Sequence, residues 1–238
     1  MKVFTWNVLH RVHGEGHGEE AVVQLADEAR RVREVVARVR SLLEVEGGSV
    51  GLLQEVSGDV LSALRLALPD RAVLNHVSPR VPRPKQGSSS VRDSTEHLVV
   101  VAPAGAQVVQ ASTAANDAGK GFLAVRTGGV TFVSTHVSWG ERGGEQLSAL
   151  RAALERLEQP VVLGGDFNVE VAVVEQALGV AAAKLAPGSL KTRESGGKGA
   201  DIDHLLARGA LLESARVLEH SGLSDHRPVV VTVCPPTH

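Results

Sequence analysis

The stretch Ser224-Asp225-His226-Arg227-Pro228 lies directly before the last apolar run of the chain, and four comparable polar clusters occur upstream. Each cluster lies at the end of a short apolar run that is typical of a strand. The upstream clusters are Trp6-Asn7, Gln54-Glu55, Gly165-Asp166-Phe167-Asn168 and Ile202-Asp203-His204. Five strand ends are therefore expected to bring Asn, Glu, Asp and His side chains to one point.

The side chains in these clusters suit a metal ion and a phosphate group. Carboxylate and amide oxygens are the ligands that a hard cation such as Mg²⁺ or Mn²⁺ prefers. A histidine beside them supplies a proton donor or a positive charge near neutral pH. The set indicates metal-assisted attack of water on a phosphate ester.

Length and composition are those of a soluble globular protein: 238 residues, of which 43% are hydrophobic and 22% charged. No apolar stretch is close to the roughly 18 residues of a membrane span, and the first residues do not have the pattern of a signal peptide. The single cysteine, Cys234, suits a reducing compartment. We therefore expect a cytoplasmic monomer with no membrane span, although export remains open.

The formal net charge of −2 argues against strong non-specific binding to long duplex nucleic acid. With four Phe, two Trp and no Tyr, the chain also has few side chains on which bases could stack. Extended single-strand binding is therefore disfavoured.

The periodicity of apolar residues predicts alternating helices and strands, with no repeat or linker dividing the chain. Helices are expected over residues 19–43, 59–68, 144–157 and 169–178. Strands are expected over residues 3–7, 50–53, 73–77, 98–101, 107–110, 122–126, 130–137, 161–163, 202–206, 211–218 and 228–233. Residues 98–101 are expected to pair with 107–110, and 122–126 with 130–137. We expect one mixed α/β domain over residues 1–238, with helices outside packed sheets.

Three polar segments and one helix face leave their roles open. Residues 10–20 contain three His and three Glu, and form either an additional transition-metal site or a solvated loop. Residues 78–92 are rich in Pro, Ser and Arg, and indicate an exposed, mobile loop that can contact substrate phosphate. Residues 191–201 are basic and glycine-rich, and either close over a ligand or remain disordered. The arginine-rich face of residues 30–40 is expected to be a solvated surface.

In their order along residues 3–233, the clusters resemble the endonuclease/exonuclease/phosphatase superfamily. Its members include deoxyribonuclease I, apurinic endonucleases, neutral sphingomyelinases, inositol-polyphosphate 5-phosphatases and deadenylases. The resemblance implies a four-layer α/β/β/α sandwich of two packed mixed sheets flanked by helices. It also implies an active site at one edge of the two sheets.

The resemblance implies a metal site made by Asn7, Glu55 and Asp225, with Glu55 as the principal ligand. For Mg²⁺ or Mn²⁺ this oxygen-rich set is chemically coherent.

Four further residues match the family's catalytic positions. The resemblance implies that Asp166 and Asn168 orient the attacking water and contact the phosphate. It places His226 on the phosphate and Asp203 on the other nitrogen of that imidazole ring. An Asp–His pair of this kind fixes the tautomer and favours the imidazolium.

A second histidine, His136, makes the chain resemble deoxyribonuclease I and the sphingomyelinases in particular. This resemblance implies that His136 also faces phosphate and that Glu96 supports it, as a glutamate does in deoxyribonuclease I. Lys120 stands where relatives often carry an arginine, so it keeps the charge but loses the bidentate fork. Leu9 stands where apurinic endonucleases carry a carboxylate, and their tyrosine has no counterpart here. Abasic-site cleavage is correspondingly disfavoured.

Together these observations predict a Mg²⁺- or Mn²⁺-dependent phosphoesterase, specifically a nuclease-type phosphodiesterase acting on DNA or RNA. Lys120, Lys191 and Arg193 are the candidate substrate-binding residues. The alternatives on the same fold are a phosphomonoesterase and a phospholipid or inositol-phosphate hydrolase. A catalytically inactive phosphate-binding module is the non-enzyme alternative, which the intact motif set opposes. His204 falls on the opposite face of its strand and is expected to be structural.

Overall fold

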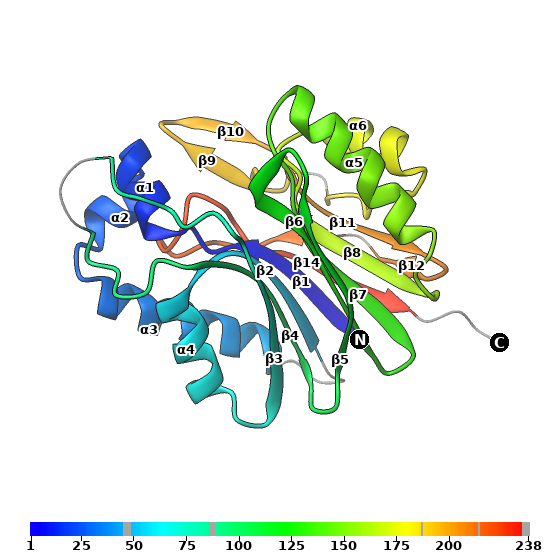
Figure 1. Ribbon diagram of the computed structural model, residues 1–238, viewed down its shortest axis with the longest axis horizontal. Helices are drawn as coiled ribbons and strands as arrows, with labels where there is room; N and C mark the ends of the chain where they lie inside the picture. Colours follow the sequence, from blue (N-terminus) through cyan, green and yellow to red (C-terminus); the bar gives the residue numbers. More distant parts are fainter. Residues whose placement is uncertain (45–48, 86–88, 187, 214, 235–238) are drawn as a thin grey trace.

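Two β-sheets pack face to face and carry helices on their outer faces (Figure 1). The computed structural model describes residues 1–44, 49–85, 89–186, 188–213 and 215–234. One sheet has the order β12 (Leu211–Leu212), β14 (Val229–Cys234), β1 (Lys2–Asn7), β2 (Ser49–Ser57), β4 (Glu96–Pro103) and β3 (Arg71–Val77), with β13 (Arg216–Val217) also paired to β14. The other has the order β11 (Asp203–Arg208), β8 (Val161–Asp166), β7 (Val130–His136), β6 (Asp117–Thr127) and β5 (Gln107–Ala114).

Helices α3 (Glu28–Leu43) and α4 (Gly58–Ala67) cover the first sheet, and α5 (Glu141–Leu154) and α6 (Val171–Leu178) cover the second. Figure 1 shows the two helix pairs on opposite sides of the molecule. The expected four-layer α/β/β/α sandwich is thereby confirmed.

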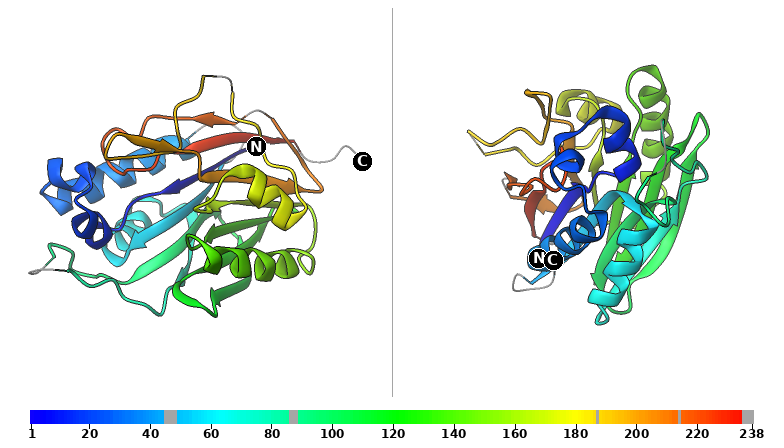
Figure 2. Two further views of the ribbon diagram at one scale, coloured as in Figure 1. Left: turned by 90° about the horizontal axis from the view of Figure 1, so that it is seen from above. Right: turned by 90° about the vertical axis from the view of Figure 1, so that its left-hand side faces the viewer.

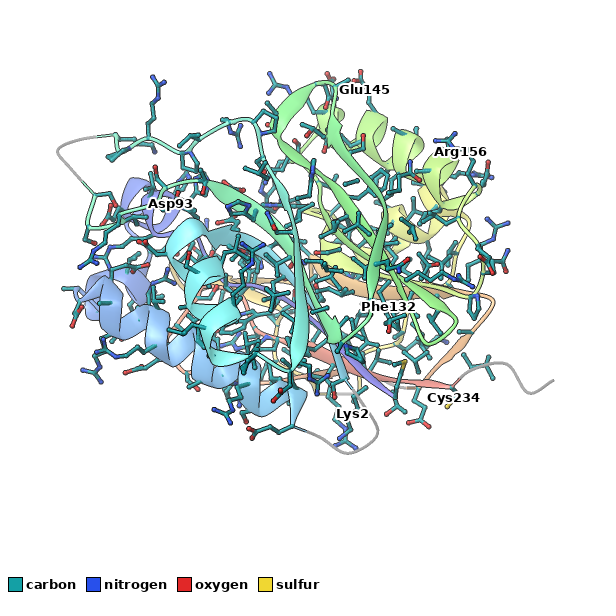
Figure 3. The ribbon with its side chains drawn as sticks, turned by 60° about the horizontal axis from the view of Figure 1, so that its bottom comes forward. Lys2, Asp93, Phe132, Glu145, Arg156 and Cys234 are labelled. Carbon is teal, nitrogen blue, oxygen red and sulfur yellow. The ribbon has the colours of Figure 1, made fainter. Side chains whose placement is uncertain are left out.

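Three hydrophobic layers hold the four structural layers together. Because successive strand residues point to opposite faces, Phe4 packs under α3 and α4 while its neighbour Val3 packs between the sheets. Phe132, labelled in Figure 3, is fully buried between the sheets. Leu147 of α5 and Phe167 belong to the third layer. Burial of this apolar surface is the main force that brings the two sheets into contact.

The two parallel strand pairs fix one edge of the molecule. β1 runs parallel to β2 and β7 runs parallel to β8, so the carboxyl ends within each pair coincide. Asn7 is in register with Gln54, and His136 with Asp166. Asp203, the first residue of antiparallel β11, is also in register with Asp166. The packing of the sheets therefore collects the predicted clusters at a single edge.

Residues 10–20 are mostly helical, so the expectation of a solvated loop is wrong, whereas the alternative of an additional transition-metal site stays a prediction. It contains α1 (Arg11–His17), followed by α2 (Glu20–Gln24). Two features stabilise α1: the His10 side chain accepts from Val12 N, and Arg11 donates to Glu15 at 2.7 Å. Gly14 also lets α1 approach α2, because a Cβ there would lie 2.4 Å from Val22 Cγ2.

The helix predicted over residues 19–43 is interrupted. Leu25 ends α2, and Asp27 starts α3 by accepting from Arg30 N at 3.2 Å. An aspartate that caps a new helix overrides the continuous apolar period.

Arg31 contradicts the expectation that the arginine-rich helix face is wholly solvated. The side chain is fully buried and makes two hydrogen bonds with the Glu28 carboxylate, at 2.8 and 3.0 Å. Its Nη1 also donates to Val8 O and Leu223 O, both at 3.1 Å. Arg31 therefore ties α3 to the segment after β1 and to the segment that precedes Asp225.

Replacing Arg31 should strongly destabilise the fold. Arg31→Ala leaves the buried Glu28 without its closest cation and two buried carbonyls without donors, so we expect a loss of about 3–5 kcal/mol in unfolding free energy. Denaturant unfolding measures this loss. The exposed Arg33 is the matched control, and Arg33→Ala should change stability by only about 0.5 kcal/mol. Equal losses in the two variants would contradict the role of Arg31.

The predicted pairing of residues 98–101 with 107–110 is wrong. β4 lies between β2 and β3 in the first sheet, whereas β5 pairs with β6 in the second. β4 has neighbours on both edges and is buried on both faces, so no edge remains for β5. The turn at residues 104–106 instead passes the chain from one sheet to the other.

The remaining segments differ from expectation in detail. Residues 193–200 are not disordered: β9 (Arg193–Ser195) and β10 (Lys198–Ala200) form a hairpin. Its turn is made by Gly196 and Gly197, both at positive φ. Residues 211–218, expected to form one strand, contain the short strands β12 and β13.

The segment 78–92 lies at the same end of the molecule as α1 and α2 (Figure 2), and Lys85 Nζ donates to Gly16 O at 2.8 Å. It is mostly exposed, as expected, in its described part; residues 86–88 lie outside the described residues. Within the described residues, no helix is both long and apolar enough to cross a membrane.

Candidate active site

A cavity of about 220 Å³ lies where the strand ends meet. The predicted site residues in its wall are Glu55, Lys120, His136, Asp166, Asn168, Arg193, Asp225 and His226. Side chains from both sheets, from the β9–β10 hairpin and from two loops therefore contribute to one site.

Backbone geometry aims two of these side chains. Glu55 has φ of 54° and lies where the pairing of β2 with β4 shifts register. Asn168 has φ of 55°, and Leu9, which also lines the cavity, has φ of 59°. Non-glycine residues adopt this left-handed conformation at a cost of about 1–3 kcal/mol, and such residues cluster at functional sites. The bulge redirects the Glu55 side chain into the cavity.

Asn7 connects the two acidic groups. Its Nδ2 donates to Glu55 Oε1 at 3.1 Å and to Asp166 Oδ2 at 3.0 Å, and its Oδ1 accepts from Leu9 N at 3.0 Å. Asn7 thus presents its amide nitrogen to the carboxylates, and its oxygen, the predicted metal ligand, is engaged by the backbone.

Asp203 and His226 form the predicted pair. His226 Nδ1 donates to Asp203 Oδ2 at 2.9 Å, and its Nε2 lies 3.8 Å from both Asp166 and Asp225. Burial alone would lower the pKa of His226, but the charges of Asp203, Asp166 and Asp225 raise this pKa to about 10. His226 is therefore an imidazolium at neutral pH.

The carboxyl groups facing this cation are ionised. Burial alone would raise the pKa of Asp166, but His226, His136 and Lys120 lower it below its ordinary value. Burial would likewise raise the pKa of Glu55, whereas the charges of His13, His136 and Lys120 lower it. Both carboxylates are thus available at neutral pH to hold a cation or to accept a hydrogen bond from water.

His136 faces the same carboxylates from the second sheet. Its Nε2 lies 3.3 Å from Asp166 Oδ2 and contacts Lys120 Nζ, while its buried Nδ1 has no hydrogen-bond partner among the described residues. Asn168 Nδ2 lies 3.5 Å from His136 Nε2 and donates to Val137 O at 2.8 Å. Lys120 and Asn168 therefore both adjoin His136 in the cavity wall, and His136 and His226 approach the same oxygen of Asp166.

The predicted support of His136 by Glu96 is replaced by a different pair. Glu96 accepts from His13 Nε2 at 2.8 Å, and His13 lines the cavity from α1. Burial alone would lower the pKa of His13, but the hydrogen bond to Glu96 and the charge of Glu55 raise it. Because α1 was expected to be a loop or a separate metal site, His13 was missed as a functional residue.

Asp225 meets an arginine. Arg193 Nε donates to Asp225 Oδ2 at 2.8 Å, and Arg193 Nη2 donates to Glu19 Oε1 at 3.4 Å. Asp225 Oδ1 is buried without a hydrogen-bond partner in the described structure. Arg193 therefore neutralises part of Asp225, and the free oxygen keeps Asp225 available as a ligand.

Two other predictions concern residues outside this cavity. Lys191 is exposed and donates to Asp201 at 2.5 Å, so in this arrangement it does not reach the site. Lys191 precedes the β9–β10 hairpin, where its side chain lies at the surface and away from the strand ends. His204 Nε2 donates to Val169 O at 2.9 Å, and its ring packs beside Phe167. Its structural role is confirmed.

The donor atoms fit a divalent cation. Glu55, His136 and Asp166 each offer a ligand atom, and these atoms lie within 4.8 Å of one another. Asp225 lines the same cavity and has one oxygen without a partner among the described residues, although it lies outside this group of three. A hard cation held by carboxylate oxygens would offset the negative charge of these carboxylates.

Comparisons with known proteins concern the whole chain and its fold. The family model described as "Endonuclease/Exonuclease/phosphatase family" matches residues 4–226, whereas no curated protein matches the chain. An endonuclease/exonuclease/phosphatase structure from Bacteroides vulgatus has a TM-score of 0.72 and 16% identity, covering 99% of this chain and 98% of that one.

Two other solved structures differ in what their descriptions state. TDP2 from D. rerio, complexed with a single-strand DNA product, has a TM-score of 0.69 and 13% identity, covering 98% of each chain. A mannosyl-6-phosphatase from Bacteroides thetaiotaomicron has a TM-score of 0.66 and 15% identity, covering 98% of this chain and 99% of that one. At these identities the likeness shows the fold and leaves the substrate open.

Proposed function

Because the chain belongs to the endonuclease/exonuclease/phosphatase family, we propose that it is a divalent-metal-dependent phosphoesterase, and specifically a nuclease-type phosphodiesterase. The observation that carries this proposal is the meeting of an Asp203–His226 pair with the ionised Glu55 and Asp166 in one cavity. A binding module would not need a charged imidazole held by a buried carboxylate.

Water activation is assigned to Asp166. Its ionised carboxylate can accept a hydrogen bond from water and so direct an oxygen lone pair towards phosphorus. The water oxygen then forms a bond to phosphorus and gives one proton to the Asp166 carboxylate, while the bond from phosphorus to the leaving oxygen breaks. The leaving oxygen takes up one proton, so the net reaction consumes one water and the carboxylate is regenerated. Asn168 fixes the neighbouring wall through its hydrogen bond to Val137 O.

Stabilisation of the negative charge that develops on the phosphoryl oxygens is assigned to the cationic side chains. The His226 imidazolium and Lys120 both line the cavity, and Lys120 Nζ contacts His136 Nε2 there. Such preorganised donors stabilise charge that develops in the transition state. Glu55 and Asp166, with Asp225 as a further donor, would hold Mg²⁺ or Mn²⁺, which when bound polarises a phosphoryl oxygen.

A second hollow supports a substrate that extends beyond its phosphate. It adjoins the cavity and shares Lys120 and Trp139 with it. An ester with a sizeable substituent can therefore place its phosphate among the strand ends and its substituent outside them.

A substrate screen tests the proposal. Single-stranded and duplex DNA, RNA, nucleotides, inositol phosphates and phospholipids are each incubated with the protein in Mg²⁺, Mn²⁺ or EDTA. We expect metal-dependent cleavage of nucleic acid by the wild type and none by Asp166→Asn. Phosphate release from monoesters alone would replace the phosphodiesterase with a phosphatase. Activity that persists in EDTA would remove the metal from the proposal.

His13 should contribute to the reaction through its charge. Glu96 holds its ring in the cavity wall, so His13→Ala removes a positive charge that faces the phosphate. We expect kcat/KM to fall about 10- to 100-fold, the range of one charged hydrogen bond. Steady-state kinetics on the substrate found by the screen measures this. Glu96→Gln keeps an acceptor but removes the charge, so its loss should be smaller; normal kcat/KM in His13→Ala would exclude the role.

A further inference from the structure

Trp139 is the one exposed aromatic ring among the Phe and Trp residues, all of which lie in described positions. Trp139 is 59% exposed, whereas the four Phe residues and Trp6 are buried. A single exposed apolar residue is common on protein surfaces. The position of this one, rather than its exposure alone, makes it informative.

Trp139 lies between the cavity and the open surface. It lines the cavity that contains Asp166 and His226, and it also lines the adjoining shallow hollow of about 430 Å³. A group bonded to a phosphate in the cavity can extend past this ring into the hollow.

The backbone beside Trp139 is held firmly by the site itself. Ser138 N donates to Gln146 Oε1 at 2.8 Å, and Ser138 Oγ donates to Asp117 at 2.9 Å. On the other side Val137 O accepts from Asn168, a residue of the cavity wall. Gly143 packs so closely on this turn that a Cβ would lie 2.3 Å from Ser138 O. The ring is exposed on a fixed support, which lowers the entropic cost of binding to it.

The charges around the hollow restrict what can bind there. Its wall combines Lys120 and Arg142 with Asp117 and Glu141. A lipid chain would require an apolar wall, which these four charged side chains do not provide. A compact, planar and polar group satisfies both the aromatic face and the mixed charges.

We propose that Trp139 forms a leaving-group subsite, and that the substrate carries a planar ring of nucleobase size next to its scissile phosphate. This inference rests on the proposed function, because it assigns the phosphate to the cavity beside Trp139. Stacking on Trp139 would orient the ester, with the phosphate between Lys120 and His226 and the ring over the indole.

Fluorescence titration tests the stacking without requiring turnover. Trp139 and Trp6 are the only two indoles in the chain. Because the buried Trp6 Nε1 donates to His226 O at 3.0 Å and can also respond to a ligand, comparison with Trp139→Phe assigns the signal. Adenosine monophosphate, glycerol phosphate and inorganic phosphate are added to Asp166→Asn, and also to the wild type in EDTA in case the variant fails to fold. We expect saturable quenching by adenosine monophosphate and none by the two ringless compounds, and Trp139→Phe should abolish the signal.

Calorimetry supplies the second readout. Trp139→Ala should weaken binding of adenosine monophosphate roughly 5- to 150-fold, the range contributed by one stacked base, and leave binding of inorganic phosphate unchanged. Leu66→Ala, which truncates an exposed apolar side chain on α4, is the control and should change neither. Equal binding of adenosine monophosphate and glycerol phosphate, with no change in Trp139→Ala, overturns the subsite. Stacking without hydrolysis of any ester would uphold the subsite and reject the proposed reaction.

Discussion

Glu55→Gln should lower the affinity for Mg²⁺ or Mn²⁺ and reduce turnover, while the protein keeps its fold. The substitution removes one negative charge from the Glu55, His136 and Asp166 cluster at nearly constant shape. The single oxygen of the glutamine can still accept from Asn7 Nδ2 or from His10 N, so one of the two hydrogen bonds to residue 55 is retained. Loss of a direct ligand should exceed the roughly 10–100-fold loss in metal affinity that follows changes outside the ligand set.

Turnover should also fall, because a metal bound beside the phosphate would stabilise the transition state. Several kcal/mol of transition-state stabilisation corresponds to a rate loss on the order of 10²–10³. Calorimetric titration of Mg²⁺ and Mn²⁺, with kinetics on the same preparations, measures both effects. Glu155→Gln changes an exposed carboxylate on the far helix layer and is the control. Unchanged metal affinity in Glu55→Gln would remove Glu55 from the metal site.

The strand ends were predictable because each carries both a local and a chemical signal. Asn7, Glu55 and Asp166 each follow a short apolar run, and parallel pairing then places their carboxyl ends at one edge. Asp203 begins one antiparallel strand, His226 precedes another, and both reach the same edge from the opposite direction. A short continuous apolar run, as in these strands buried on both faces, is a property that the sequence shows directly.

The contacts between segments were less predictable because they depend on packing. In the sequence, Arg31 cannot be distinguished from the exposed arginines of the same helix. It is buried because it packs against Val8 and Leu223. Glu96 pairs with His13 instead of the expected His136, and this choice of partner depends on how α1 folds against the sheet edge. Neither the partner of a carboxylate nor the sheet that accepts a strand has a signature in local spacing. The one available signal for α1 was Arg11 four residues before Glu15.

The site has a consistent electrostatic organisation. Carboxylates from both sheets converge, and each meets at least one cation from another segment: His226 for Asp203, Arg193 for Asp225 and His13 for Glu96. These pairs position charge without closing the cavity between Glu55 and Asp166. A phosphate ester would therefore meet oriented cations and a carboxylate-lined metal site together, which favours the phosphoesterase over a module that only binds phosphate.

Asp203→Asn should lower the pKa of His226 and reduce turnover on the order of 10²–10⁴, with little loss of fold. The buried Asp203 carboxylate is the nearest negative charge to the imidazole and accepts its Nδ1 proton. An asparagine oxygen can still accept that hydrogen bond, so the variant removes charge more than geometry. NMR titration of His226 measures the shift, and kinetics measures the rate. The same His226 pKa in both proteins would contradict the pairing.

The pH dependence of stability provides an independent check on the metal-free protein. The folded pKa of His226, about 10, lies above the ordinary value of 6.5, so folding favours the protonated ring. This contribution to unfolding free energy is fully present below pH 6.5 and is lost as pH rises through about 10. In Asp203→Asn the folded pKa moves back towards 6.5, so the unfolding free energy should depend less on pH across that window. Denaturant unfolding of both proteins in EDTA measures this difference. Parallel pH profiles would mean that Asp203 does not control the charge of His226, and the rate loss would then need another cause.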